Sequence, residues 1–199
     1  MAYKLVLLWL AALPLMGSPG PATMSLTAMG TAFGVRAGLP YLAGIMAGTF
    51  GVLLLIATGV TGLILTVPAL VWVITAIGVA YILYLAYLIA TAPPLAAAGE
   101  NGRKPAFSGG LILAITNPKA FAAIGAVYSS HTIVPGDLVL DAAVKITALL
   151  TVIVVVNTAW LAFGSALSTV LRDARTGRIA NVIFAIMLVI SVAMALLAA

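Results

Sequence analysis

The chain has 199 residues, of which 64% are hydrophobic and only 7% are charged, and its mean hydropathy is +1.29. This balance excludes a soluble domain and predicts an all-α protein that crosses the membrane several times. The chain has no cysteine and one histidine, His131, which excludes thiol redox chemistry, a thiolate metal site and a histidine-rich metal cluster, so we expect no metal and no cofactor.

We predict six transmembrane helices, because about 20 residues per crossing plus short loops leave room for six. They form a single transmembrane domain, 1–199, built from one repeat at 1–95, a polar linker at 96–107 and a second repeat at 108–199. An odd number of helices in each repeat places the two repeats in opposite orientations in the membrane, as an inverted repeat.

The first predicted helix is apolar up to Gly34 and is broken at residues 18–21, Ser-Pro-Gly-Pro. Residues 5–16 resemble the core of a signal peptide. However, residues 18–21 lack the small-residue cleavage pattern, and the apolar character resumes beyond them. We therefore expect a broken transmembrane helix rather than a cleaved leader.

The second helix is expected at about 39–66 and the third at about 69–92. In the second, Gly44 and Gly48 form a G-x-x-x-G pair, which allows another backbone to approach closely. In the third, Tyr81, Tyr84 and Tyr87 follow one face, which favours packing or an interface belt over a substrate-binding wall.

The fourth helix, about 109–128, is interrupted by Asn117-Pro118 and carries a positive charge at Lys119. Asn117 is a good N-cap and Pro118 a good first residue, so a new half-helix begins in mid-membrane. Lys119 then lies beside the positive end of the helix dipole. A charge inside a span is costly and usually functional, so this arrangement predicts an anionic group on a bound substrate.

The last two helices are expected at about 138–168 and 179–197, joined by a basic loop at 172–178. Asp141 and Lys145 lie one turn apart, and we interpret them as a snorkelling surface pair. Asn157 lies deeper, where it either forms an interhelical hydrogen bond or lines a transport path. His131, in the turn 129–137, is expected to be an interfacial hydrogen-bonding residue.

Membrane orientation follows from the positive-inside rule. The connections between helices one and two, three and four, and five and six carry six basic residues, and the other side carries two, Lys4 and Lys145. The six are Arg36, Arg103, Lys104, Arg172, Arg175 and Arg178. Both termini are therefore predicted outside the cytoplasm.

Pro21 and Pro118 occupy corresponding positions in the two repeats. Paired interruptions of this kind mark the binding site of secondary transporters, although a packing kink is the alternative explanation. Each new half-helix presents N–H groups and a partial positive charge near the midplane. The donors come from the residues that follow the prolines: Ala22, Thr23, Lys119 and Ala120.

Several of these motifs, in this order, resemble the lysine-exporter (LysE/RhtB-type) translocator family. The resemblance implies a six-helix inner-membrane exporter of amino acids or related metabolites in bacteria. Many members carry an acidic residue after the glycine of helix two, where this chain has Thr49, and this difference favours a neutral over a cationic amino acid. The motifs are residues 18–22 (Ser-Pro-Gly-Pro-Ala), the pair Gly44 and Gly48, residues 78–85 (Gly-Val-Ala-Tyr-Ile-Leu-Tyr-Leu), residues 107–110 (Phe-Ser-Gly-Gly) and residues 117–119 (Asn-Pro-Lys).

The sequence thus predicts a secondary transporter that binds the carboxylate of an amino acid near mid-membrane. The expected partners are this substrate, the lipid bilayer and, as a further candidate, a second copy of the chain, but not nucleic acid. The alternative is a small-anion or metal-ion permease or channel, whereas an enzyme is disfavoured because no paired acids or Ser–His pair occur at depth. The candidate substrate-binding residues are Ser18, Pro19, Gly20, Pro21, Thr23, Thr49, Thr116, Asn117, Pro118 and Lys119.

Overall fold

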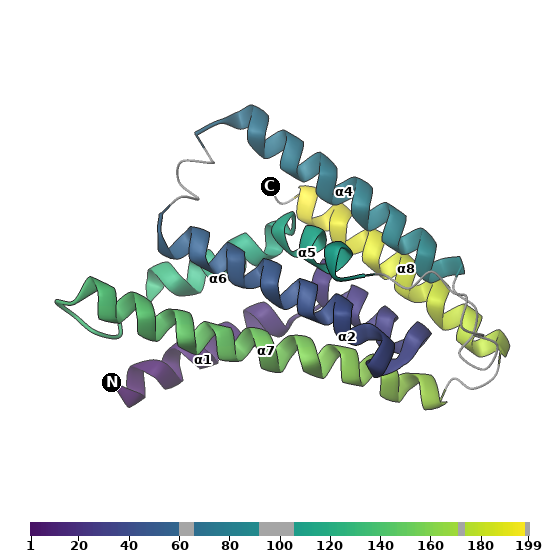
Figure 1. Cartoon of the computed structure of the whole chain (residues 1–199), viewed down its shortest axis with the longest axis horizontal. Helices are drawn as coiled ribbons and strands as arrows, with labels where there is room; N and C mark the ends of the chain where they lie inside the picture. Colours follow the sequence, from purple (N-terminus) through teal and green to yellow (C-terminus); the bar gives the residue numbers. More distant parts are fainter. Residues whose placement is uncertain (60–65, 92–105, 171–173, 198–199) are drawn as a thin grey trace.

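The computed structural model describes residues 1–59, 66–91, 106–170 and 174–197, and this part of the chain is built from α-helices without a strand (Figure 1). The all-α prediction is therefore confirmed for these residues. The helices are α1 (Ala2–Gly17), α2 (Pro21–Ala57), α4 (Pro68–Thr91), α5 (Phe107–Ile115), α6 (Pro118–Ser130), α7 (Leu138–Val170) and α8 (Ala174–Leu197).

Two helices in the described part of the chain are long and apolar enough to cross a membrane, namely Pro21–Ala57 and Leu138–Leu167. The pair α5 and α6, which is bent by 59° at its break, passes the same test as one broken span. Two shorter apolar helices cover Ala2–Gly17 and Thr75–Thr91. By length and composition, these helices suit a polytopic membrane protein.

The first predicted break lies where the sequence places it, since α1 ends at Gly17 and α2 begins at Pro21. The backbone at Gly20 is fully extended, and Pro21 is the first residue of the new helix. The hydroxyl of Thr23 accepts a hydrogen bond of 2.9 Å from the Gly20 N–H, which stabilises the helix start.

The second predicted break is also confirmed, because α5 ends at Ile115 and α6 begins at Pro118. Asn117 is the N-cap, and its side-chain oxygen accepts a hydrogen bond of 3.2 Å from the Lys119 N–H. The cap and the proline together explain why the chain starts a helix here. The Ala120 N–H also bonds to the Asn117 carbonyl oxygen at 3.0 Å, so the N–H donors predicted at Lys119 and Ala120 are both taken up by Asn117.

Although α2 is one element, it consists of two segments that fold back on each other at Gly34. Gly34 has φ 76° and ψ 170°, a conformation that a residue with a Cβ rarely adopts. The hydroxyl of Tyr41 donates to the Ser25 hydroxyl at 3.1 Å, although 16 residues separate them. In a straight helix these residues would lie about 24 Å apart. The sequence ended its first apolar run at Gly34 and began the second helix at about residue 39, whereas the structure changes direction at Gly34 itself and its second segment ends at Ala57 rather than at residue 66.

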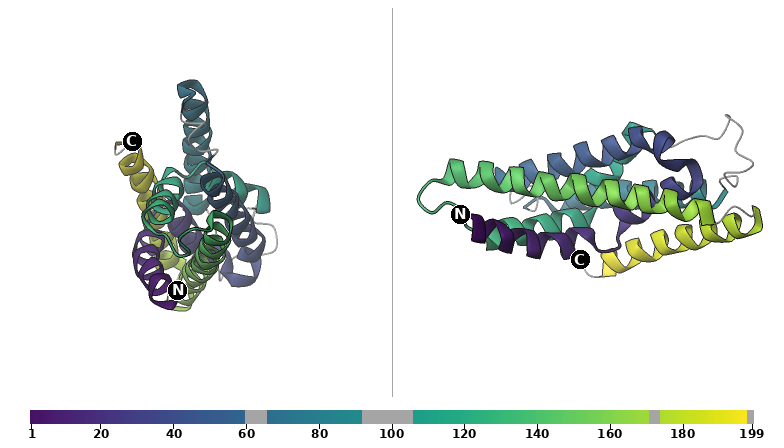
Figure 2. Two further views of the ribbon diagram at one scale, coloured as in Figure 1. Left: turned by 90° about the vertical axis from the view of Figure 1, so that its left-hand side faces the viewer. Right: turned by 90° about the horizontal axis from the view of Figure 1, so that it is seen from below.

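Helices α2 and α7 pack along each other, with α7 on the lower side of the molecule in Figure 1, and α5 packs against the second segment of α2 (Figures 1 and 2). Glycines permit this close packing. A Cβ on Gly44 would lie 2.0 Å from the Phe107 carbonyl oxygen, and one on Gly110 would lie 2.2 Å from that of Tyr41. The close backbone approach predicted at Gly44 is thus confirmed.

Helices α4 and α8 run side by side at one edge of the molecule (Figure 1). Helix α8 begins at Ala174, so Arg175 and Arg178 lie in its first turns, and the loop predicted over them was wrong. Of the tyrosines of α4, Tyr81 packs against the core, while Tyr84 and Tyr87 are exposed. Most of the predicted linker 96–107 lies outside the described residues, but its last residue, Phe107, is already helical.

Candidate functional site

A cavity of about 50 Å³ lies where the two broken helix pairs meet. That volume holds roughly three to five water molecules at 10–15 Å³ each. Five of the predicted site residues line it: Gly20, Thr23, Thr49, Asn117 and Lys119. The remaining lining residues are Met16, Ala22, Ala120, Ala123, Ile124, Ile153, Val156 and Asn157. Residues next to Pro21 and next to Pro118 therefore share one cavity.

The ammonium group of Lys119 lies at this cavity and reaches from α6 to the end of α1. It donates a hydrogen bond to the Ser18 carbonyl oxygen and another, of 3.1 Å, to the Pro19 carbonyl oxygen. An ammonium group has three donors, so these contacts leave one N–H. The lysine chain passes over Gly20, where an added Cβ would lie 2.6 Å from Lys119 Cδ.

Asn117 contributes a second hydrogen-bond donor to the cavity. Its Oδ1 is occupied by the Lys119 N–H, which directs the amide NH₂ away from that contact. The side chain is almost fully buried, and it finds no acceptor for Nδ2 within the part of the chain that the structure describes. Beside it, the first turn of α2 adds the N–H groups of Ala22 and Thr23, which have no carbonyl one turn earlier in their own helix.

The other predicted site residues have different roles in the structure. The Ser18 hydroxyl donates to the Leu15 carbonyl oxygen at 3.0 Å, and the Thr116 hydroxyl donates to that of Ile112 at 2.7 Å. Thr116 also packs against Gly78 of α4. None of Ser18, Pro19, Pro21, Thr116 and Pro118 lines the cavity. The carbonyl oxygens of Ser18 and Pro19 accept hydrogen bonds from Lys119 at the cavity. Pro21 and Pro118 are the first residues of α2 and α6.

Thr49 on α2 and Asn157 on α7 also line the cavity. The sequence indicated Asn157 only as an alternative, and the lining residues Met16, Ile153 and Val156 were missed because apolar residues in apolar helices give no signal. Within the cavity wall there is one cation, Lys119, and no carboxylate.

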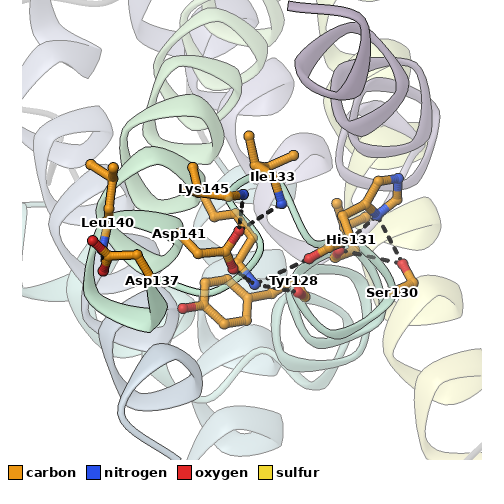
Figure 3. A network of polar contacts seen from close by, with 10 residues as sticks. Tyr128, Ser130, His131, Ile133, Asp137, Leu140, Asp141 and Lys145 are labelled. Carbon is orange, nitrogen blue, oxygen red and sulfur yellow. Dashed lines mark hydrogen bonds and ion pairs between the residues drawn. The ribbon is translucent and has the colours of Figure 1, made fainter. Parts of the chain in front are cut away.

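A second polar cluster lies at the turn between α6 and α7 (Figure 3). Asp141 and Lys145 form an ion pair of 2.8 Å and are only 6% and 7% exposed. The carboxylate also accepts hydrogen bonds of 2.6 and 2.8 Å from the N–H groups of Ile133 and Val134. The snorkelling surface pair predicted from the sequence was therefore wrong, because both side chains are buried near the start of α7.

The ammonium group of Lys145 also has several polar partners in this cluster. Lys145 Nζ donates to the carbonyl oxygens of Tyr128 and His131 at 3.2 and 3.1 Å and lies 4.0 Å from the centroid of the Tyr128 ring. His131 Nδ1 lies 2.9 Å from the Val127 carbonyl oxygen and 3.0 Å from the Ser130 hydroxyl. These contacts tie the turn to α7 and do not reach the cavity.

An apolar helical molecule in which two helices begin at a shared cavity that also holds a lysine and two asparagines has the organisation of a membrane transport protein. The chain belongs to the LysE type translocator family, because residues 13–199 match the sequence model of that family. This membership confirms the resemblance found in the sequence and agrees with a transport protein rather than an enzyme.

Curated relatives point to the same class. The chain is 33% identical over 175 residues to the cysteine/O-acetylserine efflux protein of Salmonella choleraesuis (strain SC-B67), and the match covers 86% of this chain and 87% of the relative. The protein of the same name from Salmonella typhimurium (strain LT2) shows the same identity and coverage. No solved structure matches the chain.

Proposed function

We propose that the protein exports neutral amino acids, or closely related small metabolites, from the cytoplasm of a bacterium. The observation that carries this proposal is the cavity at which Lys119, Asn117 and the start of α2 present hydrogen-bond donors together. The names of the relatives support it, because cysteine and O-acetylserine are both neutral amino acids.

The donors suit the carboxylate of the substrate. Lys119 has one N–H beyond the two that bind Ser18 and Pro19, and Asn117 has its amide NH₂. Charge-assisted hydrogen bonds each contribute about 1.5–3 kcal/mol, so two or three of them suffice for reversible binding. The helix start at Pro21 adds a favourable dipole.

A neutral side chain fits this cavity better than a cationic one. Its wall contains one lysine and no carboxylate, so a lysine or arginine side chain of the substrate would enter without a counter-charge. The remaining surface is formed mostly by Met16, Ile124, Ile153 and Val156. This surface suits a small, uncharged side chain.

The proposed transport also requires an architecture with two halves that can move relative to each other. Six spans arranged as two inverted repeats, with α1 and α2 at the first break and α5 and α6 at the second, allow alternating access by rocking one repeat against the other. We place the protein in the bacterial inner membrane with both termini outside the cytoplasm, as the distribution of basic residues predicts.

Counterflow in proteoliposomes tests this function without knowledge of the coupling ion. Vesicles loaded with unlabelled L-cysteine under reducing conditions should accumulate external labelled L-cysteine through the wild-type protein. The Lys119→Ala variant should lower the initial rate about ten- to a hundredfold, as expected for losing one charge-assisted contact. A matched lysine variant far from the cavity, Lys4→Ala, should leave the rate unchanged.

Two results would contradict the proposal. One is an unchanged rate in Lys119→Ala, provided that the variant elutes as the wild type does in size-exclusion chromatography. The other is competition by chloride but not by alanine or leucine, which would favour the small-anion pathway that a lone buried lysine also fits. Among the described residues, no group of three or more His, Cys, Asp or Glu side chains gathers, so nothing specific favours a metal ion.

A further inference from the structure

Two hydrogen-bond acceptors line the cavity together with Lys119. They are the hydroxyl of Thr49 and the amide oxygen of Asn157, and the two residues are only 8% and 6% exposed. The Asn157 NH₂ donates to the Ile153 carbonyl oxygen at 2.8 Å, which fixes the orientation of the amide and leaves Oδ1 on its other side. Within the described residues, neither oxygen accepts a hydrogen bond.

This state is unusual for polar groups in a buried place. More than nine-tenths of buried polar groups have a partner, and leaving one unpaired costs about 1–3 kcal/mol. Helical threonines usually donate to the carbonyl one turn earlier, as Thr27 and Thr31 of the same helix do at 2.9 Å. Thr49 makes no such contact, so its hydroxyl is available for a group in the cavity.

We propose that Thr49 and Asn157 bind the α-ammonium group of the substrate, so that the cavity recognises an amino acid as a zwitterion. This inference rests on the proposed function and deepens it. The donors come from Lys119, Asn117 and the start of α2, and the acceptors come from the second segment of α2 and from α7, so both kinds of group line one cavity. Donors and uncharged acceptors in one cavity suit the two opposite charges of an α-amino acid.

The chemistry of the acceptors explains the substrate class. An ammonium group donates three hydrogen bonds, and uncharged amide and hydroxyl oxygens accept them without adding a net charge to the cavity. Because the zwitterion carries no net charge, it needs no buried carboxylate in the wall. An organic acid without an amino group leaves the two oxygens unpaired, so the site selects against it.

A pair of ligands isolates the ammonium group. L-Cysteine and 3-mercaptopropionate differ only by the α-amino group, and their dissociation constants can be measured by titration calorimetry on the purified full-length protein in nanodiscs under reducing conditions. The wild type should bind L-cysteine at least about tenfold more tightly, because one or two hydrogen bonds to a charged group are lost in the analogue.

Variants of Thr49 and Asn157 then test whether these two residues cause the preference for L-cysteine. Thr49→Val and Asn157→Leu, which are close to isosteric, should each weaken L-cysteine about tenfold and leave 3-mercaptopropionate within about twofold. Asn157→Asp retains an acceptor and should retain affinity for L-cysteine. Equal weakening of both ligands, or no change for either, would overturn the inference. Should the apolar variants fail to fold, equal affinities of the wild type for the two ligands would overturn it by themselves.

The failure of this inference differs from the failure of the proposed function. Lys119→Ala should weaken both ligands, because both carry the carboxylate. If Lys119→Ala weakens both but the wild type does not prefer L-cysteine, the carboxylate site stands and the ammonium site is wrong. If the wild type binds neither ligand, both proposals are wrong.

Discussion

Breaking the buried pair of Asp141 and Lys145 should destabilise the protein strongly. The pair is almost fully buried at 2.8 Å, and each charge has further polar contacts. Lys145→Met leaves the carboxylate with two N–H donors but without a counter-charge, and removal of one partner of such a pair costs about 3–5 kcal/mol. Asp141→Asn retains an acceptor for the N–H groups of Ile133 and Val134 while removing the charge.

The double variant D141N/K145M tests whether the two charges act together. It removes both, so its cost should be smaller than the sum of the single costs by about 1.5 kcal/mol or more. Reversible denaturant unfolding in micelles measures these free energies, with Lys4→Met as a matched control that should stay within about 0.5 kcal/mol of the wild type. Single costs below about 1 kcal/mol that add independently would show a solvent-exposed pair and refute the reasoning.

Three further changes test the packing around the cavity. Gly20→Ala places a Cβ 2.6 Å from Lys119 Cδ, so it should displace the lysine and slow L-cysteine counterflow at least about tenfold. This variant should lose little stability, because the extended backbone at residue 20 suits any residue. Asn117→Ala removes the α6 cap and should lower the free energy of unfolding by about 1 kcal/mol in the micelle assay, and an unchanged value would argue against the cap. Gly110→Val would bring a side chain within 2.2 Å of the Tyr41 carbonyl oxygen, so this variant should fail to yield a monodisperse peak in size-exclusion chromatography, which a correctly packed variant would show.

The helix breaks could be predicted from the sequence because their causes are local. A capping residue followed by proline starts a helix wherever it occurs, and this rule located the start of α6 at Pro118. The same holds for Pro21 after the extended Gly20. The change of direction between the first two predicted helices was located only approximately, after the apolar run that ends at Gly34, and the structure has it at Gly34, where φ is positive.

The depth of a side chain could not be predicted in the same way. Asp141 and Lys145 have the spacing of an exposed ion pair, but the turn before α7 folds over them and supplies two N–H donors and two carbonyl acceptors. Similarly, Ser18 and Thr116 are polar residues at the breaks, yet their hydroxyls bond to their own helices. Burial depends on which distant segments pack together, and spacing along one helix does not contain that information.

The position of Lys119 raises a physical question, because a cation beside the N-terminus of a helix is electrostatically unfavourable. The end of α1 compensates this unfavourable placement. The ammonium group bonds to the carbonyl oxygens of Ser18 and Pro19, just beyond the C-terminal end of α1, where the helix dipole is negative. The lysine is therefore partly compensated before any substrate binds. Under the proposed function, a substrate carboxylate gains one N–H of an ammonium group that already has other partners, so we expect binding of moderate affinity. Moderate affinity is what an exporter requires, since a cargo held by a fully uncompensated buried charge would leave slowly.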